Sequence, residues 1–173
     1  SAERLQSLIN DIIKLSELDD SDLKLEFETV DLHELGEQCV SSMQMQAEKN
    51  EVTLQLEGTS VPMSGNKTLL EELLFNLCSN AVRYNKKGGS VTIVTAIENT
   101  RPVLIVKDTG IGIPKEQQER VFERFYRVDK SRSKSTGGTG LGLAIVKHIV
   151  AQHDAQISMT SEVGVGTEIK VVF

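Results

Sequence analysis

Apolar positions along this chain repeat first with a helical and then with a strand period. Residues 2–18 carry a leucine or isoleucine at nearly every third or fourth position, which predicts an amphipathic helix. An apolar stripe of this kind needs a partner helix, either from the same chain or from a second copy. The acidic run at residues 19–22 ends the pattern. Residues 23–30 then alternate between apolar and polar, which predicts a strand with one buried face.

The rest of the chain divides into further helices and strands joined by turns. Asp31 and Asn66 are each suited to cap a helix, and the helices that they open run to about residues 50 and 84. A further helix follows over residues 144–150. Short apolar runs predict strands over residues 52–56, 91–97, 103–106, 156–160 and 167–173, with a hairpin turn at residues 99–102.

Composition and charge narrow the class of protein. A chain of 173 residues, 39% of them apolar, is expected to fold as one domain with its own core. Its net charge of −6 argues against general binding of nucleic acid. Cys39 and Cys78 fall in helical patterns without metal-ligand spacing, which favours a reduced, cytoplasmic setting. No apolar run is long enough to span a bilayer, so we expect no membrane contact by this chain. Because it begins without Met and inside a helix, we expect it to be part of a longer protein.

The stretch Asp108-Thr109-Gly110-Ile111-Gly112-Ile113-Pro114 directly follows the apolar run at residues 103–106. Glycines let a backbone bend sharply and let a flat ligand approach closely. An ionised carboxylate only accepts hydrogen bonds, so Asp108 beside such a slot suits an exocyclic amine such as that of adenine. The alternative is a strand-to-loop turn in which Asp108 caps the local backbone.

Polar residues gather on one face of the helix that Asn66 opens. Glu72, Asn76 and Asn80 repeat every four residues, and Arg83-Tyr84 extends the same face. Asparagine is a poor helix former, so these amides are expected to be exposed, hydrogen-bonded or bound to a ligand. A solvated polar face is the alternative interpretation.

Residues 115–136 form a long basic segment without strong periodicity. It holds seven Lys or Arg and four Asp or Glu within an acidic chain. A loop of this length in a compact domain is usually a lid or disordered, and its charge, including Lys130 and Arg132, suits a polyphosphate. We expect the aromatic run at residues 122–126 to anchor one end of it. A solvated basic loop is the alternative.

A glycine-rich loop at residues 137–143 leads directly into the helix at residues 144–150. Such a loop presents free N–H groups and the positive end of the helix dipole, which is a phosphate site. The spacing matches neither the dinucleotide-binding fingerprint nor the P-loop. His33, His148 and His153 lie on or at the ends of predicted helices, which favours surface or helix-end roles over catalysis.

Four of these motifs together resemble a known family. Residues 76–84, 108–114, 122–126 and 138–143 stand in the order of the N, G1, F and G2 boxes. From about residue 30 to its end, the chain is similar to the ATP-binding catalytic domain of bacterial sensor histidine kinases, within the gyrase/Hsp90/histidine kinase/MutL superfamily. The resemblance implies an α/β fold of Bergerat type, a two-layer α/β sandwich whose mixed sheet carries helices on one face, with an N-terminal helical stub.

The resemblance also implies a division of the chain into three parts. Residues 1–20 resemble the second helix of the dimerisation and phosphotransfer hairpin, residues 21–30 form a linker and first strand, and residues 31–173 form the catalytic domain. The histidine that accepts phosphate lies on the first helix of that hairpin, which this sequence does not contain, and none of the three histidines replaces it.

The resemblance gives a role to each candidate site residue. Asp108 is expected to bind the adenine amine, with Gly112 and Tyr84 at the ring and Thr167 reaching the base through water. Asn76 is expected to hold Mg²⁺, while Asn80 and Arg83 meet phosphate oxygens and Arg127 is a candidate for the γ-phosphate. Glu72 stands where related ATPases carry a base. The remaining expected contacts to ATP come from Gly110, Ile113, Gly138, Thr139, Gly140, Leu141, Gly142 and Leu143.

The implied activity is that of a protein histidine kinase. ATP binds with Mg²⁺, and its γ-phosphate passes to a histidine of the hairpin and then to an aspartate of a response regulator. The full-length protein is expected to be a membrane-anchored homodimer with this domain in the cytoplasm, and the fragment alone a monomer. Two alternatives remain: a clamp-type ATPase of the same superfamily, or an interaction module that binds ATP without transferring it.

Overall fold

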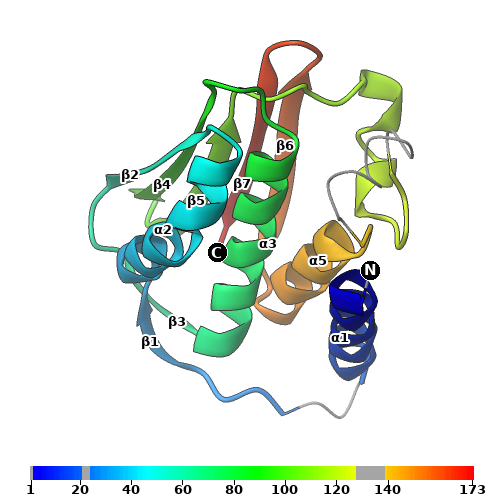
Figure 1. Cartoon of the computed structure of the whole chain (residues 1–173). Helices are drawn as coiled ribbons and strands as arrows, with labels where there is room; N and C mark the ends of the chain where they lie inside the picture. Colours follow the sequence, from blue (N-terminus) through cyan, green and yellow to red (C-terminus); the bar gives the residue numbers. More distant parts are fainter. Residues whose placement is uncertain (1, 21–23, 128–138) are drawn as a thin grey trace.

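A mixed five-stranded sheet covered on one face by helices forms the body of the protein (Figure 1). The structure is a computed structural model that describes residues 2–20, 24–127 and 139–173. The strands lie in the order β2 (Thr53–Gly58), β4 (Ser90–Glu98), β5 (Arg101–Asp108), β7 (Gly166–Val172) and β6 (Gln156–Glu162). β2 and β4 pair in parallel, and the other neighbours pair antiparallel. The predicted two-layer α/β fold is confirmed.

A separate antiparallel pair joins β1 (Glu28–Asp31) to β3 (Pro62–Gly65). The strand predicted over residues 23–30 is wrong in extent, since residues 24–27 form no strand and Leu23 lies outside the described residues. The alternation that suggested it has another cause. Leu25 packs against the edge of the core, while the half-exposed Phe27 ring stacks on the His153 ring with centroids 5.0 Å apart. β3 was not predicted.

Side chains at the predicted caps begin the two long helices next to the sheet. In α2 (Leu32–Lys49), Asp31 accepts the backbone N–H of His33 at 2.9 Å. In α3 (Lys67–Arg83), Asn66 accepts the backbone N–H of Leu69 at 3.0 Å. Both caps satisfy donors that a helix leaves unpaired at its start, and both predictions are confirmed. The helix after the glycine loop is α5 (Gly142–Gln152), and short 3₁₀ turns η1 (Lys115–Gln117) and η2 (Arg120–Phe122) precede it.

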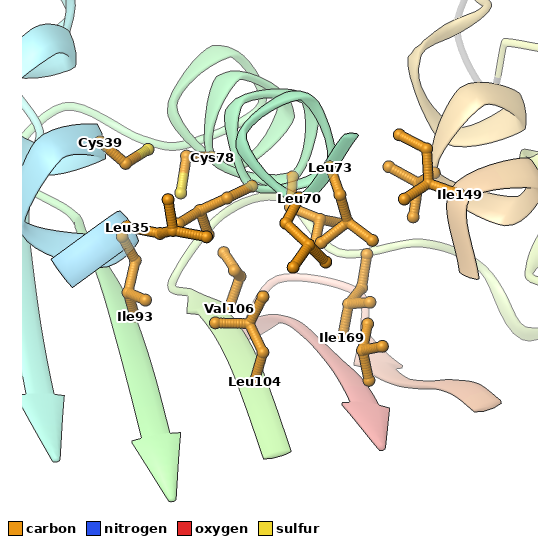
Figure 2. Packing of buried hydrophobic residues seen from close by; sticks show 14 of the residues in the cluster. Leu35, Cys39, Leu70, Leu73, Cys78, Ile93, Leu104, Val106, Ile149 and Ile169 are labelled. Carbon is orange, nitrogen blue, oxygen red and sulfur yellow. The ribbon is translucent and has the colours of Figure 1, made fainter. Parts of the chain in front are cut away.

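The hydrophobic core lies between these helices and the sheet. Leucines of α3 and Ile149 of α5 meet strand residues of β5 and β7, as Figure 2 shows for Leu70, Leu73, Leu104 and Ile169. Cys39 of α2 and Cys78 of α3 are buried in the same layer as free thiols. This packing fixes α3 across the sheet, and so positions the polar face of that helix.

The N-terminal helix α1 (Ala2–Leu18) lies against α5 (Figure 1). Leu15 and Leu18 are buried in the core, whereas Leu5, Ile9, Ile12 and Ile13 are 43–59% exposed. The predicted apolar stripe therefore finds part of its partner within the chain. Among the described residues, no helix combines the length and apolar character needed to cross a membrane.

Candidate active site

A cavity of about 510 Å³ opens between α3, the start of α5 and the edge of the sheet where β5 ends. Side chains from distant parts of the sequence line it, including Asn76 on α3, Asp108 at the end of β5 and Thr167 on β7. The sheet topology brings these residues together, because β5 and β7 are antiparallel neighbours with Asp108 opposite Thr167.

Asp108 is held rigidly by backbone donors. Its Oδ1 accepts the N–H of Gly110 at 2.8 Å and the N–H of Thr167 at 3.1 Å. Burial raises the pKa of the Asp108 carboxyl, and these two hydrogen bonds lower it. Within the described part of the chain no donor bonds to Oδ2. One oxygen thus fixes the carboxylate, and the other can accept a hydrogen bond from a ligand in the cavity.

In the loop after β5, glycine is needed where a Cβ atom would collide with the neighbouring backbone. Gly112 has φ +73°, and a Cβ placed there would lie 2.1 Å from the carbonyl oxygen of Glu162. A Cβ on Gly110 would lie 2.5 Å from the carbonyl oxygen of Tyr84. Gly110 does not line the cavity, but its N–H orients Asp108. Ile113 lines the cavity and donates its N–H to Ser161 Oγ at 2.8 Å, and that oxygen also lies 2.8 Å from Thr167 Oγ1.

Apolar side chains complete the wall near Asp108. Val106 and Ile169 come from the face of β5 and β7 that the helices cover, and Met159 and Ile111 join them. These four residues were not predicted as site residues. The alternation of the strands could have indicated Val106 and Ile169. These two residues share one face of the paired strands with Asp108 and Thr167.

The polar face of α3 lines the cavity as predicted. The Nδ2 of Asn76 donates to the backbone oxygen of Glu72 at 2.9 Å, which leaves its Oδ1 for other contacts. A Cβ on Gly142 would lie 3.1 Å from that Oδ1, so the start of α5 passes close to the Asn76 amide. Arg83 donates to Asn80 Oδ1 at 3.4 Å and to Ser79 Oγ at 3.3 Å. Asn76 and Asn80 both line the cavity, so both amides can take part in binding a ligand.

Positive charge gathers beside this face. Burial lowers the pKa of the Arg127 guanidinium, and the nearby charges of Arg4 and Arg83 lower it further. Arg127 and Thr139 also line a smaller pocket of about 240 Å³ together with Arg4 of α1. Three guanidinium groups that repel one another create a positive potential, which favours an anion such as phosphate.

The described part of the glycine loop lines the cavity with every residue except one. Thr139, Gly140, Gly142 and Leu143 line it, whereas Leu141 is fully buried in the hydrophobic core. A contact between the Leu141 side chain and a ligand is therefore not supported by its position. Gly138 lies outside the described residues. α5 begins at this loop, so the positive end of its helix dipole lies beside the same cavity as Asn76.

Within the predicted anchor at residues 122–126, Phe125 contacts the body of the domain through its backbone and not through a buried ring. Phe125 is 56% exposed, but its backbone N–H donates to the oxygen of Gly140 at 2.9 Å. Val121 is buried, and Tyr126 donates its hydroxyl to Gln117 at 2.8 Å. Residues 128–136, with Lys130 and Arg132, lie outside the described residues.

Comparison with known proteins identifies the family. Residues 65–173 match the family model for the histidine kinase-, DNA gyrase B-, and HSP90-like ATPase. The chain is 39% identical to the sensor-like histidine kinase SenX3 of Mycolicibacterium smegmatis over 96% of this chain and 44% of that protein. It is 37% identical to the sensor histidine kinase WalK of Bacillus subtilis over 96% of this chain and 28% of that protein. The chain belongs to this ATPase family.

A solved structure agrees with this assignment. Full-length ShkA in complex with AMPPNP superposes with a TM-score of 0.85 at 27% identity, over 97% of this chain and 35% of that chain. The present chain thus spans less than half the length of these relatives. Because the similar proteins are sensor histidine kinases, the clamp-type ATPase is not favoured, and the predicted histidine kinase domain is confirmed.

Most predicted site residues of this kinase domain line the one cavity. They are Glu72, Asn76, Asn80, Arg83, Tyr84, Asp108, Gly112, Ile113, Arg127, Thr139, Gly140, Gly142, Leu143 and Thr167. Their individual roles stay predictions. The contribution of α1 was not predicted, although its Ser7, Asn10 and Asp11 also line the cavity. The signal was the polar spacing of Arg4, Ser7 and Asp11 on one helix face, which the apolar stripe obscured.

The three histidines lie away from the cavity. His33 Nδ1 is 2.9 Å from Thr95 Oγ1, and His148 Nε2 is 3.3 Å from Asp19 Oδ1. His153 is packed against the rings of Phe27 and Phe173. None of the three is among the residues that line the cavity.

Proposed function

We propose that the cavity binds ATP with Mg²⁺ and that this domain transfers the γ-phosphate to a histidine outside the cavity. The observation that carries the proposal is that the partly buried carboxylate of Asp108 and the Asn76 amide line one cavity with a positively charged border. The acceptor histidine would then pass its phosphate to an aspartate of a response regulator, as the relation to sensor histidine kinases suggests.

Recognition of the base would depend on Asp108. Its free Oδ2 can only accept a hydrogen bond. It therefore suits the exocyclic amine of adenine, which donates, and disfavours a keto oxygen at the same place. Val106, Ile111 and Ile169 would cover the ring faces, since apolar walls with a few placed polar groups are typical of nucleotide pockets. Gly112 supplies the close backbone approach that a flat ring needs, and Thr167 would reach the base through a water molecule.

The chemistry of the donors near the phosphates fits Mg²⁺. The ion prefers oxygen ligands and keeps several waters, which a single amide oxygen from Asn76 can accommodate. When bound, Mg²⁺ would neutralise phosphate charge during the transfer. Asn80, Arg83 and Arg127 would contact phosphate oxygens, and the N–H groups of the glycine loop would bind the rest. The part of the chain that the structure describes holds no cluster of three acidic, histidine or cysteine side chains that could bind a metal.

Glu72 lines the cavity but does not need to act as a base. A histidine nucleophile attacks through a ring nitrogen that already carries a lone pair, so it needs less activation than water. We propose that the backbone of Glu72 matters more, because its carbonyl orients Asn76.

The acceptor would be a histidine that comes to the cavity from elsewhere in a longer protein, since His33, His148 and His153 do not line the cavity. We propose that residues 1–20 continue a dimerisation and phosphotransfer hairpin and that residues 31–173 form the catalytic domain. In this proposal the whole protein is a membrane-anchored homodimer, and the domain works in the cytoplasm, where ATP is available.

A transfer assay tests the proposal. The chain is incubated with radiolabelled ATP and Mg²⁺, alone and with a separately purified phosphotransfer hairpin that carries the acceptor histidine. We expect acid-labile label on the hairpin and none on the chain itself. Stable acid-labile label on His33, His148 or His153 would contradict the proposed acceptor, and rapid hydrolysis of ATP without transfer would contradict the kinase activity.

A further inference from the structure

Helix α1 reaches into the nucleotide cavity through a single acidic contact. The hydroxyl of Thr139 in the glycine loop donates to Oδ2 of Asp11 at 2.7 Å, and Asp11 lies with Ser7 and Asn10 along the cavity wall. The same hydroxyl oxygen accepts the backbone N–H of Leu141 at 3.2 Å. Thr139 therefore connects the charge on α1 to the start of α5.

Other contacts fix α1 in the position that places Asp11 there. Leu15 and Leu18 are buried against the core, and Gln152 of α5 donates to the backbone oxygen of Leu18 at 3.2 Å. Asp19, just after the helix, pairs with Arg124 and lies 3.3 Å from His148 Nε2. The hydrogen bond with Arg124 lowers the pKa of the Asp19 carboxyl, so this pair is ionised at neutral pH. Asp11, with Ser7 and Asn10, thus belongs to the part of α1 that lies at the ligand cavity.

The charge of Asp11 is opposite in sign to the charges of Arg83 and Arg127. Arg83 and Arg127 line the same cavity and suit phosphate, whereas an ionised carboxylate repels phosphate at short range. Phosphate oxygens that take the N–H groups of the glycine loop would also compete for Thr139. Bound nucleotide and the Asp11 contact therefore favour different positions of α1 and the loop.

We propose that Asp11 is a positioning residue that holds the glycine loop through Thr139 and that the phosphates of a bound nucleotide displace it. The proposal rests on the proposed nucleotide site. It follows that docking of α1 and binding of a triphosphate oppose each other, and each weakens the other by the same factor. The effect is larger for a triphosphate than for a diphosphate, because the triphosphate carries more negative charge.

Binding measurements on the whole chain test the proposal with variants that keep the fold. Asp11→Asn retains an oxygen that can accept from Thr139 but removes the charge. We expect its affinity for a non-hydrolysable ATP analogue with Mg²⁺ to rise about threefold, with a smaller gain for ADP. Glu17→Gln is the matched control, since it removes one carboxylate from α1 at a position that does not line the cavity. It should leave both affinities unchanged.

Hydrogen exchange of α1 gives a second readout. The ATP analogue should increase exchange over residues 5–18 in the wild type but much less in Asp11→Asn. Thr139→Val, which removes the hydroxyl but keeps the shape, should increase this exchange even without nucleotide, and Thr139→Ser should restore protection. A gain of affinity cannot result from partial unfolding, so Asp11→Asn is informative even if its stability changes.

The outcomes separate this inference from the proposed function. If the wild type binds no adenine nucleotide, the proposed function fails. If the wild type binds and Asp11→Asn binds the ATP analogue no more tightly, or Glu17→Gln gains as much, the positioning role of Asp11 is wrong and the proposed function stands.

Discussion

The side-chain nitrogen of Asn76 donates to the backbone oxygen of Glu72 at 2.9 Å, one turn earlier on α3. This bond fixes which end of the amide is the acceptor, because Nδ2 carries the hydrogens. The Oδ1 atom is left next to Gly142 at the start of α5. An amide in the middle of a helix is thereby held in one orientation before any ligand arrives.

Removing this amide should abolish the contribution of Mg²⁺ to nucleotide binding. We expect Asn76→Ala to lose roughly 5- to 150-fold in affinity for ADP with Mg²⁺, because a hydrogen-bonded or metal-bound amide contributes on the order of 1–3 kcal/mol. Affinity for ADP in the presence of a chelator should stay within about twofold of the wild type. Calorimetric titration with and without Mg²⁺ measures both, and an equal loss in the two conditions would contradict a metal role for Asn76.

Asp108→Asn should weaken nucleotide binding without weakening the fold. The amide oxygen of Asn can keep both backbone bonds of Oδ1, but its NH₂ group would face the adenine amine. We expect a loss in affinity of roughly 5- to 150-fold, equivalent to about 1–3 kcal/mol.

The stability of this variant follows from the raised pKa of Asp108. A carboxyl whose pKa is raised in the folded state adds stability at pH values below its unfolded-state pKa, and that contribution is lost as the pH rises through the folded-state pKa. At pH 7 the buried charge is therefore a cost, and Asp108→Asn should melt at the same temperature as the wild type or higher. A clear fall in the melting temperature at pH 7 would show that the charge itself stabilises the loop.

Gly112→Ala should destabilise the protein more than Gly164→Ala. Both glycines have a positive φ, +73° and +82°, so each substitution carries a backbone cost of about 1–2 kcal/mol. Only at Gly112 would the new Cβ meet backbone, 2.1 Å from the oxygen of Glu162, whereas nothing lies within 4 Å at Gly164. We expect a total loss of about 3 kcal/mol or more for Gly112→Ala. Urea unfolding of both variants measures the difference, and equal losses would mean that the loop relaxes away from Glu162.

His153 should make the fold sensitive to acid. Its Nε2 accepts the backbone N–H of Asn66 at 3.1 Å, and its Nδ1 lies 2.8 Å from the oxygen of Ile149, so the neutral ring fits both partners. Burial lowers the pKa of His153 below its usual 6.5, while the bond to Ile149 raises it. A lowered folded-state pKa gives stability that is present above the unfolded-state pKa and is lost as the pH falls through the folded-state pKa.

His153→Phe tests this pH dependence. The variant keeps a ring against Phe27 but leaves the N–H of Asn66 without its acceptor, so we expect a loss of about 1–3 kcal/mol at pH 7.5. Its stability should fall less than that of the wild type between pH 7.5 and pH 5. Denaturant unfolding at several pH values measures both, and parallel pH profiles would exclude His153 as the group responsible.

The long elements of the fold were predictable because local signals agree there. At α2 and α3 a capping side chain stands before an apolar stripe, and both helices begin where Asp31 and Asn66 predict. β3 escaped prediction because its four residues begin with proline and lack alternation, and β1 supplies the pairing that makes it a strand. At residues 24–27 apolar and polar residues also alternate, but there the apolar side chains pack from an irregular segment. The alternation alone cannot distinguish such a segment from a strand.

The candidate site was predictable where its residues lie close together in the sequence. Spacing indicated Asp108 with its two glycines and the Asn76 face of α3 as candidate ligand residues, and their assignment to ATP came from the resemblance of the four motifs. The place of α1 could not, because it depends on how Leu15 and Leu18 pack against α5. Leu141 shows where the motif predicts too much. The motif assigns every residue of the loop to the ligand, but the side chain of Leu141 is buried in the hydrophobic core.

The burial of Leu141 has a consequence for how a signal can travel through the domain. Its side chain is inserted into the core between two residues that line the cavity, Gly140 and Gly142. A change in the shape of the loop on the Gly140 side must therefore stop at Leu141, because moving this side chain would open the core. We therefore expect α5 to keep its place on the sheet when a ligand binds in the cavity. A structural change caused by the ligand would then reach other parts of the domain through Thr139 and the residues that contact it. The burial of Leu141 would direct that change toward Thr139 and away from α5.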